Sequence, residues 1–470
     1  MRRARHGILP LLVLLWGACS ASRPALRPTT APPLPKASPV PALNGVQTLP
    51  NGLRVLHLPS SSHDLELGLF FPGGPIDDPA EWSGLTSFLP DVGLLPLSGG
   101  IDPSAASLRN GSRVQGVRAS ALFGWSMTSA EGEIESSLRL LHRIVTRESL
   151  PPGPYERLRA RTAEELGTVF DPAVYQAWAV AAGASMGHGR PVGLYGRDDA
   201  FGTLDASVVL AHWRRLVVPE RAVLVVAGGA DDSLGPAALA ALGSWRGAKT
   251  STAPLKTCWI GSETSHLIVD AESTAQRVYI LLALRVPGLG EPGREEVEIG
   301  LETLSAVPDG RLARVVGEAK ARSMSPHIID LGWNGGDKGS LLLMRVSGRS
   351  RETLRALWNI IEAIHGLGRT LPVDAELLAS RRRHAEQRQR DLKSPGSRLL
   401  AGARRVLYGE ASFSQTDFKE HARSIFRRRS VSVVGVGPRP LAPVLAELGT
   451  LTIWDKGGLI LKGGKHAGCR

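Results

Sequence analysis

Short apolar runs and runs with helical spacing follow one another along the chain in an order that occurs twice. In the first half, residues 53–58 and 65–71 are short apolar segments, which predict two β-strands. Residues 133–146 carry apolar side chains at helical spacing, which predicts an amphipathic helix. The other elements expected here are a strand at 117–128, a helix from 151–154 to about 167, a helix at 205–216 and a strand within 219–228.

The second half has the same kind of pattern after a stretch at 230–262 that predicts a short helix and a linker. Strands are expected at 266–269, 275–282, 328–331, 340–346 and 431–436, and helices at 295–305, 311–321, 350–367, 373–393, 395–408 and 416–427. Because strand pairs lead into helices and then a closing strand in both halves, the sequence predicts an α+β fold with an internal duplication. The expected organisation is a first domain at 45–240, a linker at 241–262, a second domain at 263–455 and a tail at 456–470.

The N-terminus has the pattern of a targeting segment. Residues 1–19 begin with arginines, continue with an apolar run too short to span a bilayer, and end in Gly17-Ala18-Cys19. Small residues before Cys19 resemble a bacterial lipobox, in which the cysteine is lipidated, and Ser20 after it favours the outer membrane by that resemblance. Plain secretion and the absence of any export signal are the alternatives. Residues 20–44 contain seven prolines and predict a semi-rigid tether between a membrane and the folded body.

The chain is basic, with a formal net charge of +12, which favours contact with anionic lipids or polyanions. Its densest clusters are Arg381-Arg382-Arg383 and Arg427-Arg428-Arg429. Both lie in or at the end of predicted helices and no aromatic residues interleave them, so we expect no nucleic-acid binding. No later stretch is apolar enough to predict a transmembrane helix. Cys258 and Cys469 could pair in an oxidising compartment or remain thiols, and the sequence leaves this open.

Residues 82–95, reading WSGLTSFLPDVGLL, follow the first two predicted strands and a Pro-Gly-Gly-Pro turn. Together with LPNGLRV at 49–55, this order resembles the insulinase/pitrilysin-type metallopeptidases, the inverzincins. That family has two homologous LuxS/insulinase-type α+β domains and begins this helix as Gly-Leu before the zinc-binding HxxEH motif. In this chain Ser87, Pro90 and Asp91 stand at the three motif positions, so the zinc ligands and the catalytic glutamate are missing. Because proline disrupts helix interiors, we expect the helix to stop or kink near Leu89.

Further family positions are expected from the same resemblance. Glu165, in a Glu-Glu-Leu sequence shortly before Asp171-Pro172, stands at the third zinc-ligand position and is the one family ligand retained. The alternative is that it is a helix-surface carboxylate. Gly317 and Met324 stand at the Arg and Tyr that help to hold substrate in the second domain of the family. The resemblance therefore implies a scaffold without its catalytic groups. No zinc or other cofactor is expected, although Asp91 and Glu165 together could attract Ca²⁺ or Mg²⁺.

Three functions agree with this interpretation. Family members often work as pairs in which a degenerate chain closes a chamber around the substrate of an active chain, so the first hypothesis is a non-catalytic partner of an active zinc peptidase. The second is a lipid-anchored, stand-alone protein that binds peptides or envelope components. The third is a weak hydrolase with a rearranged site. In each case the expected location is the cell envelope, facing the periplasm.

Overall fold

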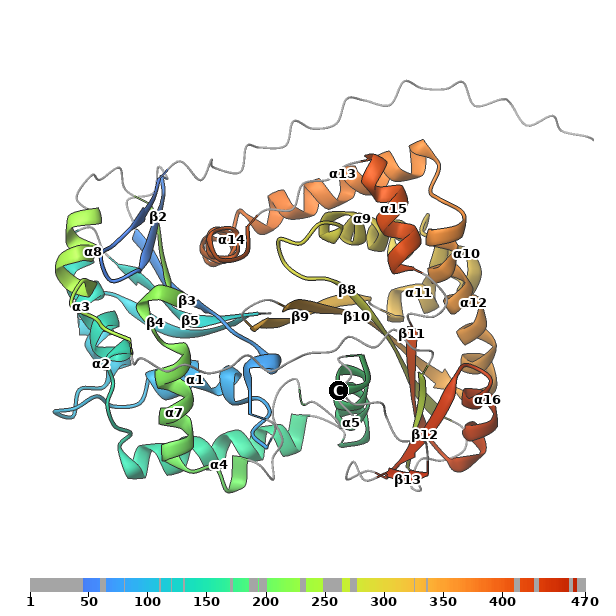
Figure 1. Cartoon of the computed structure of the whole chain (residues 1–470), viewed down its shortest axis with the longest axis horizontal. Helices are drawn as coiled ribbons and strands as arrows, with labels where there is room; N and C mark the ends of the chain where they lie inside the picture. Colours follow the sequence, from blue (N-terminus) through green and yellow to red (C-terminus); the bar gives the residue numbers. More distant parts are fainter. Residues whose placement is uncertain are drawn as a thin grey trace, which may run out of the picture. The chain divides into compact units, whose positions relative to one another are not determined.

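Figure 1 shows the computed structural model of the chain. The structure describes residues 45–59, 65–79, 81–109, 111–119, 121–129, 132–169, 172–185, 193, 201–228, 234–247, 264–270, 277–324, 326–334, 337–409, 415–426, 431–455 and 460–462. Cys19, the tether at 20–44, Cys258, Cys469, Asp171 and the cluster at 427–429 lie outside these residues.

The first half of the described chain forms a six-stranded sheet in the order β1-β2-β6-β3-β5-β4. The inner strand β6 is a continuous apolar run that is buried along its whole length, and β3 is buried from Leu67 onward, whereas β4 at the edge is largely exposed or half-buried. β2 and β6 are parallel, and the pairs from β6 to β4 are antiparallel. The strands are β1 (Val46–Thr48), β2 (Arg54–Leu58), β3 (Leu65–Pro72), β4 (Arg113–Ala119), β5 (Leu122–Ser129) and β6 (Val223–Ala227).

The second half forms a seven-stranded sheet in the order β13-β12-β7-β11-β8-β10-β9. Its segment β7-β11-β8-β10-β9 repeats β2-β6-β3-β5-β4, with one parallel pair followed by three antiparallel pairs in both sheets. The α+β fold class and the internal duplication are therefore confirmed. The strands are β7 (Thr264–Val269), β8 (Arg277–Pro287), β9 (His327–Asn334), β10 (Asp337–Arg349), β11 (Val431–Gly437), β12 (Thr450–Trp454) and β13 (Ile460–Lys462).

The helices occur at matching places in the two halves, between the second and third strands of the repeat and again before its closing strand. In the first half they are η1 (Pro75–Asp77), α1 (Leu85–Gly93), α2 (Pro103–Arg109), α3 (Ile134–Val145), α4 (Pro152–Val169), α5 (Pro172–Ser185), α7 (Ala206–Leu216), η2 (Pro219–Arg221) and α8 (Leu234–Leu242). In the second half they are α9 (Arg294–Ser305), α10 (Arg311–Val316), α11 (Glu318–Met324), α12 (Ser350–Arg369), α13 (Asp374–Asp391), α14 (Pro395–Tyr408), α15 (Gln415–Ile425), η4 (Arg439–Leu441) and α16 (Ala442–Ala446). Among the described helices, none combines the length and the apolar character that crossing a membrane requires.

Two helices are exchanged between the halves (Figure 1). α5 belongs to the first half by sequence but packs on β11, β8 and β7 of the second sheet, through Ala177, Val180 and Ala181. α14 belongs to the second half but packs on β6, β3 and β2 of the first sheet, through Leu399 and Ala403. Each sheet therefore has one face covered by a helix from the other half, so the two cores depend on each other.

The structure corrects four expectations about individual elements. The single strand expected at 117–128 is a hairpin of β4 and β5, with Ala121 at φ 62° in its turn. The helix expected at 311–321 is broken into α10 and α11 at Gly317, whose φ is 82°. α1 does not stop near Leu89 but continues to Gly93. α5 was not predicted because it is apolar without a clear polar face, and β12, which pairs with β7, was not predicted either.

Candidate functional site

The helix that carries the degenerate motif, α1, begins on a buried carboxylate. Asp78 accepts hydrogen bonds from the backbone N–H groups of Gly84 at 2.6 Å and Thr86 at 2.7 Å, and from the Thr86 hydroxyl at 2.6 Å. Gly84 adopts φ 87°, a left-handed conformation that favours glycine. The carboxylate satisfies amides that the first turn of a helix leaves without partners, so Asp78 fixes where α1 begins.

A buried polar network extends from Asp78 to α7. Thr86 Oγ1 lies 2.9 Å from His212 Nε2, and Arg215 donates to His212 Nδ1 at 3.0 Å. Because the Thr86 hydroxyl gives its proton to Asp78, His212 carries its proton on Nε2 and is neutral. Burial, with the positive charge of Arg215 beside it, holds the pKa of His212 well below its ordinary value. The network is thus a positioning device, with no group free to react.

Both carboxyl groups of the acidic pair Asp77-Asp78 are buried. Burial raises the pKa of Asp77 to about 6, against the positive charge of Arg221. Burial also raises the pKa of Asp78 to about 7, against the hydrogen bonds from Thr86 and Gly84. Asp77 accepts a hydrogen bond from the Gly74 backbone at 2.9 Å, which closes the turn before α1.

Contacts from the neighbouring strands β4 and β5 accommodate Pro90 within α1. Trp125 Nε1 donates to the Pro90 carbonyl at 2.9 Å. A Cβ atom at Gly116, on the neighbouring strand β4, would lie 2.9 Å from the Pro90 Cβ, so only glycine leaves room there. Beyond the helix, the buried Arg147 guanidinium donates to the carbonyls of Gly93, Leu95 and Pro96. The two ends of α1 are therefore held by side chains from other elements.

At the degenerate motif, the side chains of Ser87 and Asp91 both interact with other protein groups. Ser87 Oγ donates to the Gly84 carbonyl at 2.7 Å, within its own helix. Asp91 forms an ion pair with Arg118 of β4, and Arg118 Nε also donates to the Ser87 carbonyl at 2.6 Å. Burial raises the pKa of Asp91, while Arg118 and Arg161 lower it and Glu165 raises it. A guanidinium thus lies against the carboxylate at the position of the second motif histidine.

Glu165 lies on α4 within electrostatic range of Asp91, as its effect on the pKa of Asp91 shows. Its own partner is Arg161, one turn earlier, with Nε 3.6 Å from the Glu165 carboxylate. The side chain is 64 % exposed. Two carboxylates and two guanidinium groups therefore share this site. This donor set does not fit zinc, since neither a histidine nor a free carboxylate faces a common point, and no group of three possible ligands occurs among the described residues.

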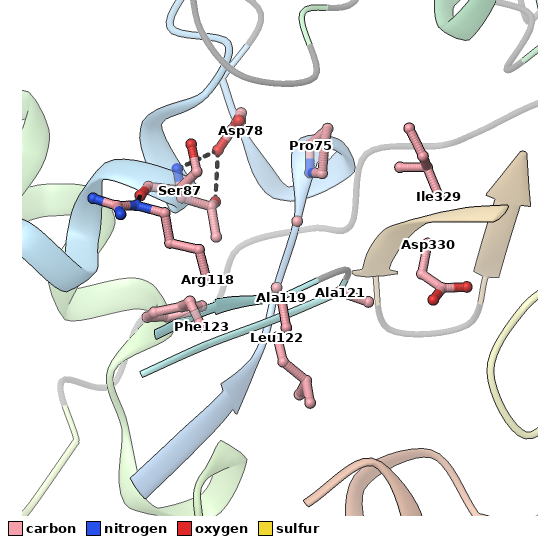
Figure 2. A pocket seen from close by; sticks show the side chains of 13 residues that line it. Pro75, Asp78, Ser87, Arg118, Ala119, Ala121, Leu122, Phe123, Ile329 and Asp330 are labelled. Carbon is pink, nitrogen blue, oxygen red and sulfur yellow. Dashed lines mark hydrogen bonds between the residues drawn. The ribbon is translucent and has the colours of Figure 1, made fainter. Parts of the chain in front are cut away.

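A pocket of about 300 Å³ opens beside the motif helix. Figure 2 shows Ser87 and Arg118 at one side of it and Ile329 and Asp330 of β9 at the other. The rest of the lining is mainly apolar or backbone. It consists of Gly73, Gly74, Pro75, Asp78, Thr86, Ala119, Ala121, Leu122 and Phe123. The pocket lies between the edge strands of the two sheets, β4 and β9, so both halves of the chain form it.

Comparison with solved structures identifies this architecture. A protease from Helicobacter pylori superposes with a TM-score of 0.69 at 14 % identity, covering 84 % of this chain and 99 % of that chain. The chain has the fold of the M16-like peptidases. An inactive domain of such a peptidase from Pseudomonas fluorescens gives a TM-score of 0.64 at 15 % identity, over 84 % of this chain and 97 % of that domain. A chain of complex III₂ from Candida albicans, with Inz-5 bound, gives 0.63 at 16 % identity, over 83 % and 95 %.

No protein-family model and no curated protein matches the sequence. The M16-like fold confirms the resemblance at the level of architecture, including the presence of an inactive domain among the similar structures. This is the insulinase/pitrilysin-type architecture expected from LPNGLRV and from the Gly-Leu start of α1.

In this M16-like fold, the two expected second-domain positions lie away from the pocket. Gly317 joins α10 to α11, and a Cβ atom there would meet nothing within 4 Å. Met324 ends α11 and is buried in the apolar core of the second half. Arg118 was missed by sequence reasoning. The sequence does not identify Arg118 as a site residue, because only the pairing of β4 with β5 places it beside α1.

Proposed function

We propose that the chain is a non-catalytic subunit with the insulinase/pitrilysin-type fold, which works beside an active zinc peptidase and contributes peptide contacts to a shared chamber. The observation that carries the proposal is the ion pair between Arg118 of β4 and Asp91 of α1. Evolution of a rearranged catalytic site would leave a nucleophile or base facing the pocket, whereas here Ser87 bonds its own helix and Asp91 is neutralised. The scaffold is retained while its chemistry is blocked.

The pocket supports a role in holding polypeptide. Leu122, Phe123 and Ile329 contribute apolar lining, and Arg118 and Asp330, each already in an ion pair, lie at opposite sides. Such a lining suits a peptide backbone with apolar side chains better than a compact ion. The pocket also lies beside β4, an edge strand of the kind to which an extended chain can add.

The proposal includes an envelope location, with Cys19 lipidated and the folded body facing the periplasm. It rests on the sequence pattern at 1–44, which lies outside the described residues. Cys19→Ser should move the protein from the membrane fraction to the soluble fraction after cell breakage. Retention of this variant in the outer membrane would contradict lipid anchoring through Cys19.

The absence of catalysis is tested by metal content and turnover of the purified chain. Atomic spectroscopy should find no stoichiometric zinc after incubation with zinc and gel filtration, and a quenched fluorescent peptide library should stay uncut. Asp91→Asn is the matched control, because it keeps the side-chain shape and removes the charge. One zinc per chain in the natural protein, lost in Asp91→Asn and accompanied by chelator-sensitive cleavage, would contradict the proposal.

A further inference from the structure

The face of the second sheet that α5 covers is apolar at one end of β10 and basic at the other. Leu341 and Leu343 point to this face and belong to the apolar cluster with α5. Side chains alternate along a strand, so Arg345, Ser347 and Arg349 point to the same face, and all three are exposed. Leu342, Met344 and Val346 are buried on the opposite face. The sheet therefore continues past the helix as a basic, uncovered surface.

The two arginines of this surface have no ionic partner within the part of the chain that the structure describes. Among the described residues, neither Arg345 nor Arg349 takes part in a salt bridge or a side-chain hydrogen bond. Strands β8, β9 and β10 contain five Arg or Lys residues and two Asp residues by sequence. Of the two Asp residues, Asp330 already forms an ion pair with Arg294 at 2.6 Å and accepts a hydrogen bond from Ser340 at 2.6 Å. Within the described residues, the positive charges of Arg345 and Arg349 are therefore not offset by a salt bridge.

Aromatic side chains border the arginines. Trp178 of α5 donates from Nε1 to the Tyr279 hydroxyl at 2.8 Å, and its ring lies 5.3 Å from the His327 ring, tilted by 32°. In the strand register Tyr279 is opposite Ser347, and His327 is opposite Leu343. Arg345 lies between these two positions on β10. A half-buried aromatic group beside unpaired arginines is typical of surfaces that bind polypeptide.

The surface is continuous with the pocket along β9. Ile329 lines the pocket, and His327 lies two residues earlier on the same face of the same strand. β9 is the edge strand of its sheet. A polypeptide that occupies the pocket can therefore follow β9 to His327 and reach Arg345 without crossing the sheet.

We propose that the arginine face, formed by Arg345, Ser347 and Arg349 with Trp178, Tyr279 and His327, binds an acidic segment of an extended polypeptide whose neighbouring residues occupy the pocket. The inference rests on the proposed peptide-holding function and adds the chemistry of the peptide. Arg345 and Arg349 are four residues apart on one strand, or about 13 Å at ~3.3 Å per residue. Carboxylates four residues apart on an extended peptide match that spacing.

The test is fluorescence anisotropy with three labelled peptides on the full-length protein. They share a Val/Thr/Ser sequence and carry Glu, Gln or Lys at two positions four residues apart. The Glu peptide should bind most tightly, and its affinity should fall as salt is raised. Arg345→Gln with Arg349→Gln should weaken the Glu peptide about two- to thirtyfold, which corresponds to about 0.4–2 kcal/mol for two exposed ion pairs, and should leave the Gln peptide unchanged. Arg109→Gln is the control, since Arg109 is an exposed arginine at the end of α2.

The other outcomes distinguish failure of the arginine face from failure of peptide binding in the pocket. Equal binding of the Glu and Gln peptides, unaffected by the double variant, would overturn the arginine face while leaving peptide binding in the pocket intact. No binding of any peptide would overturn both. Binding of vesicles containing phosphatidylglycerol that is lost in the double variant, without binding of the Glu peptide, would show that the face binds anionic lipid and would also overturn the proposal.

Discussion

The exchange of helices makes a sharp prediction about Gly402, which lies on the face of α14 against the first sheet. A Cβ atom at this position would lie 3.1 Å from Leu56, 3.2 Å from Leu58 and 3.2 Å from Val225. Gly402→Ala gains about 1 kcal/mol of helix propensity and crowds three flexible side chains, so we expect it to be nearly neutral. Gly402→Val adds two methyl groups to this contact and should cost about 1–3 kcal/mol by overpacking.

The matched control is Gly396→Val on the same helix, where a Cβ atom would meet nothing within 4 Å. Urea unfolding gives the loss of stability, and amide hydrogen exchange shows where it occurs. Gly402→Val should lower protection in β2 and β6, although these strands lie in the other half of the sequence. Equal stability of the two valine variants, or loss of protection confined to the second half, would refute the argument that the halves share their cores.

Three further predictions concern the motif helix. Arg147→Met removes the donors to three carbonyls beyond α1 and should lower the free energy of unfolding by about 3 kcal/mol, measured in urea. Asp91→Ala and Arg118→Met should each change it by less than about 1 kcal/mol, because the ion pair is partly exposed, and a double-mutant cycle that gives a much larger coupling would contradict this. Folded-state pKa values of about 6 for Asp77 and about 7 for Asp78 exceed the ~3.9 of an unfolded aspartate, so the pair's contribution to stability should rise as the pH falls from about 7 to 5, while His212, whose pKa is lowered, contributes in the opposite direction. Asp77→Asn should reduce that rise, and an unchanged pH profile would show that Asp77 stays ionised.

The sequence predicted well those elements whose apolar and polar residues follow a strand or helix pattern within a short stretch. β2 and β3 are apolar runs bounded by turn residues, and α3 has one apolar face. The hairpin of β4 and β5 was read as one strand because Ala121 occupies a left-handed turn position where glycine or asparagine is the usual signal. α5 was missed because a helix buried against another sheet has no polar face from which a period can be recognised.

The candidate site, too, could be predicted only in part from the sequence. The loss of the zinc ligands at Ser87, Pro90 and Asp91 could be read directly, because the motif is contiguous. What took their place could not be read, since Arg118 reaches Asp91 only through the pairing of β4 beside α1. Nor could the continuation of α1 through Pro90 be predicted, because it depends on the Trp125 hydrogen bond and on the space left by Gly116.

The measurement that tests the central claim most directly is gentle capture of the tagged full-length protein from its own membranes, followed by quantitative mass spectrometry. We expect a stoichiometric companion of the same fold that carries an intact HxxEH motif, and recovery of zinc-dependent peptidase activity in the captured material. Recovery of the chain alone, with no such companion and no activity, would contradict its role as a partner subunit and favour a stand-alone binding protein.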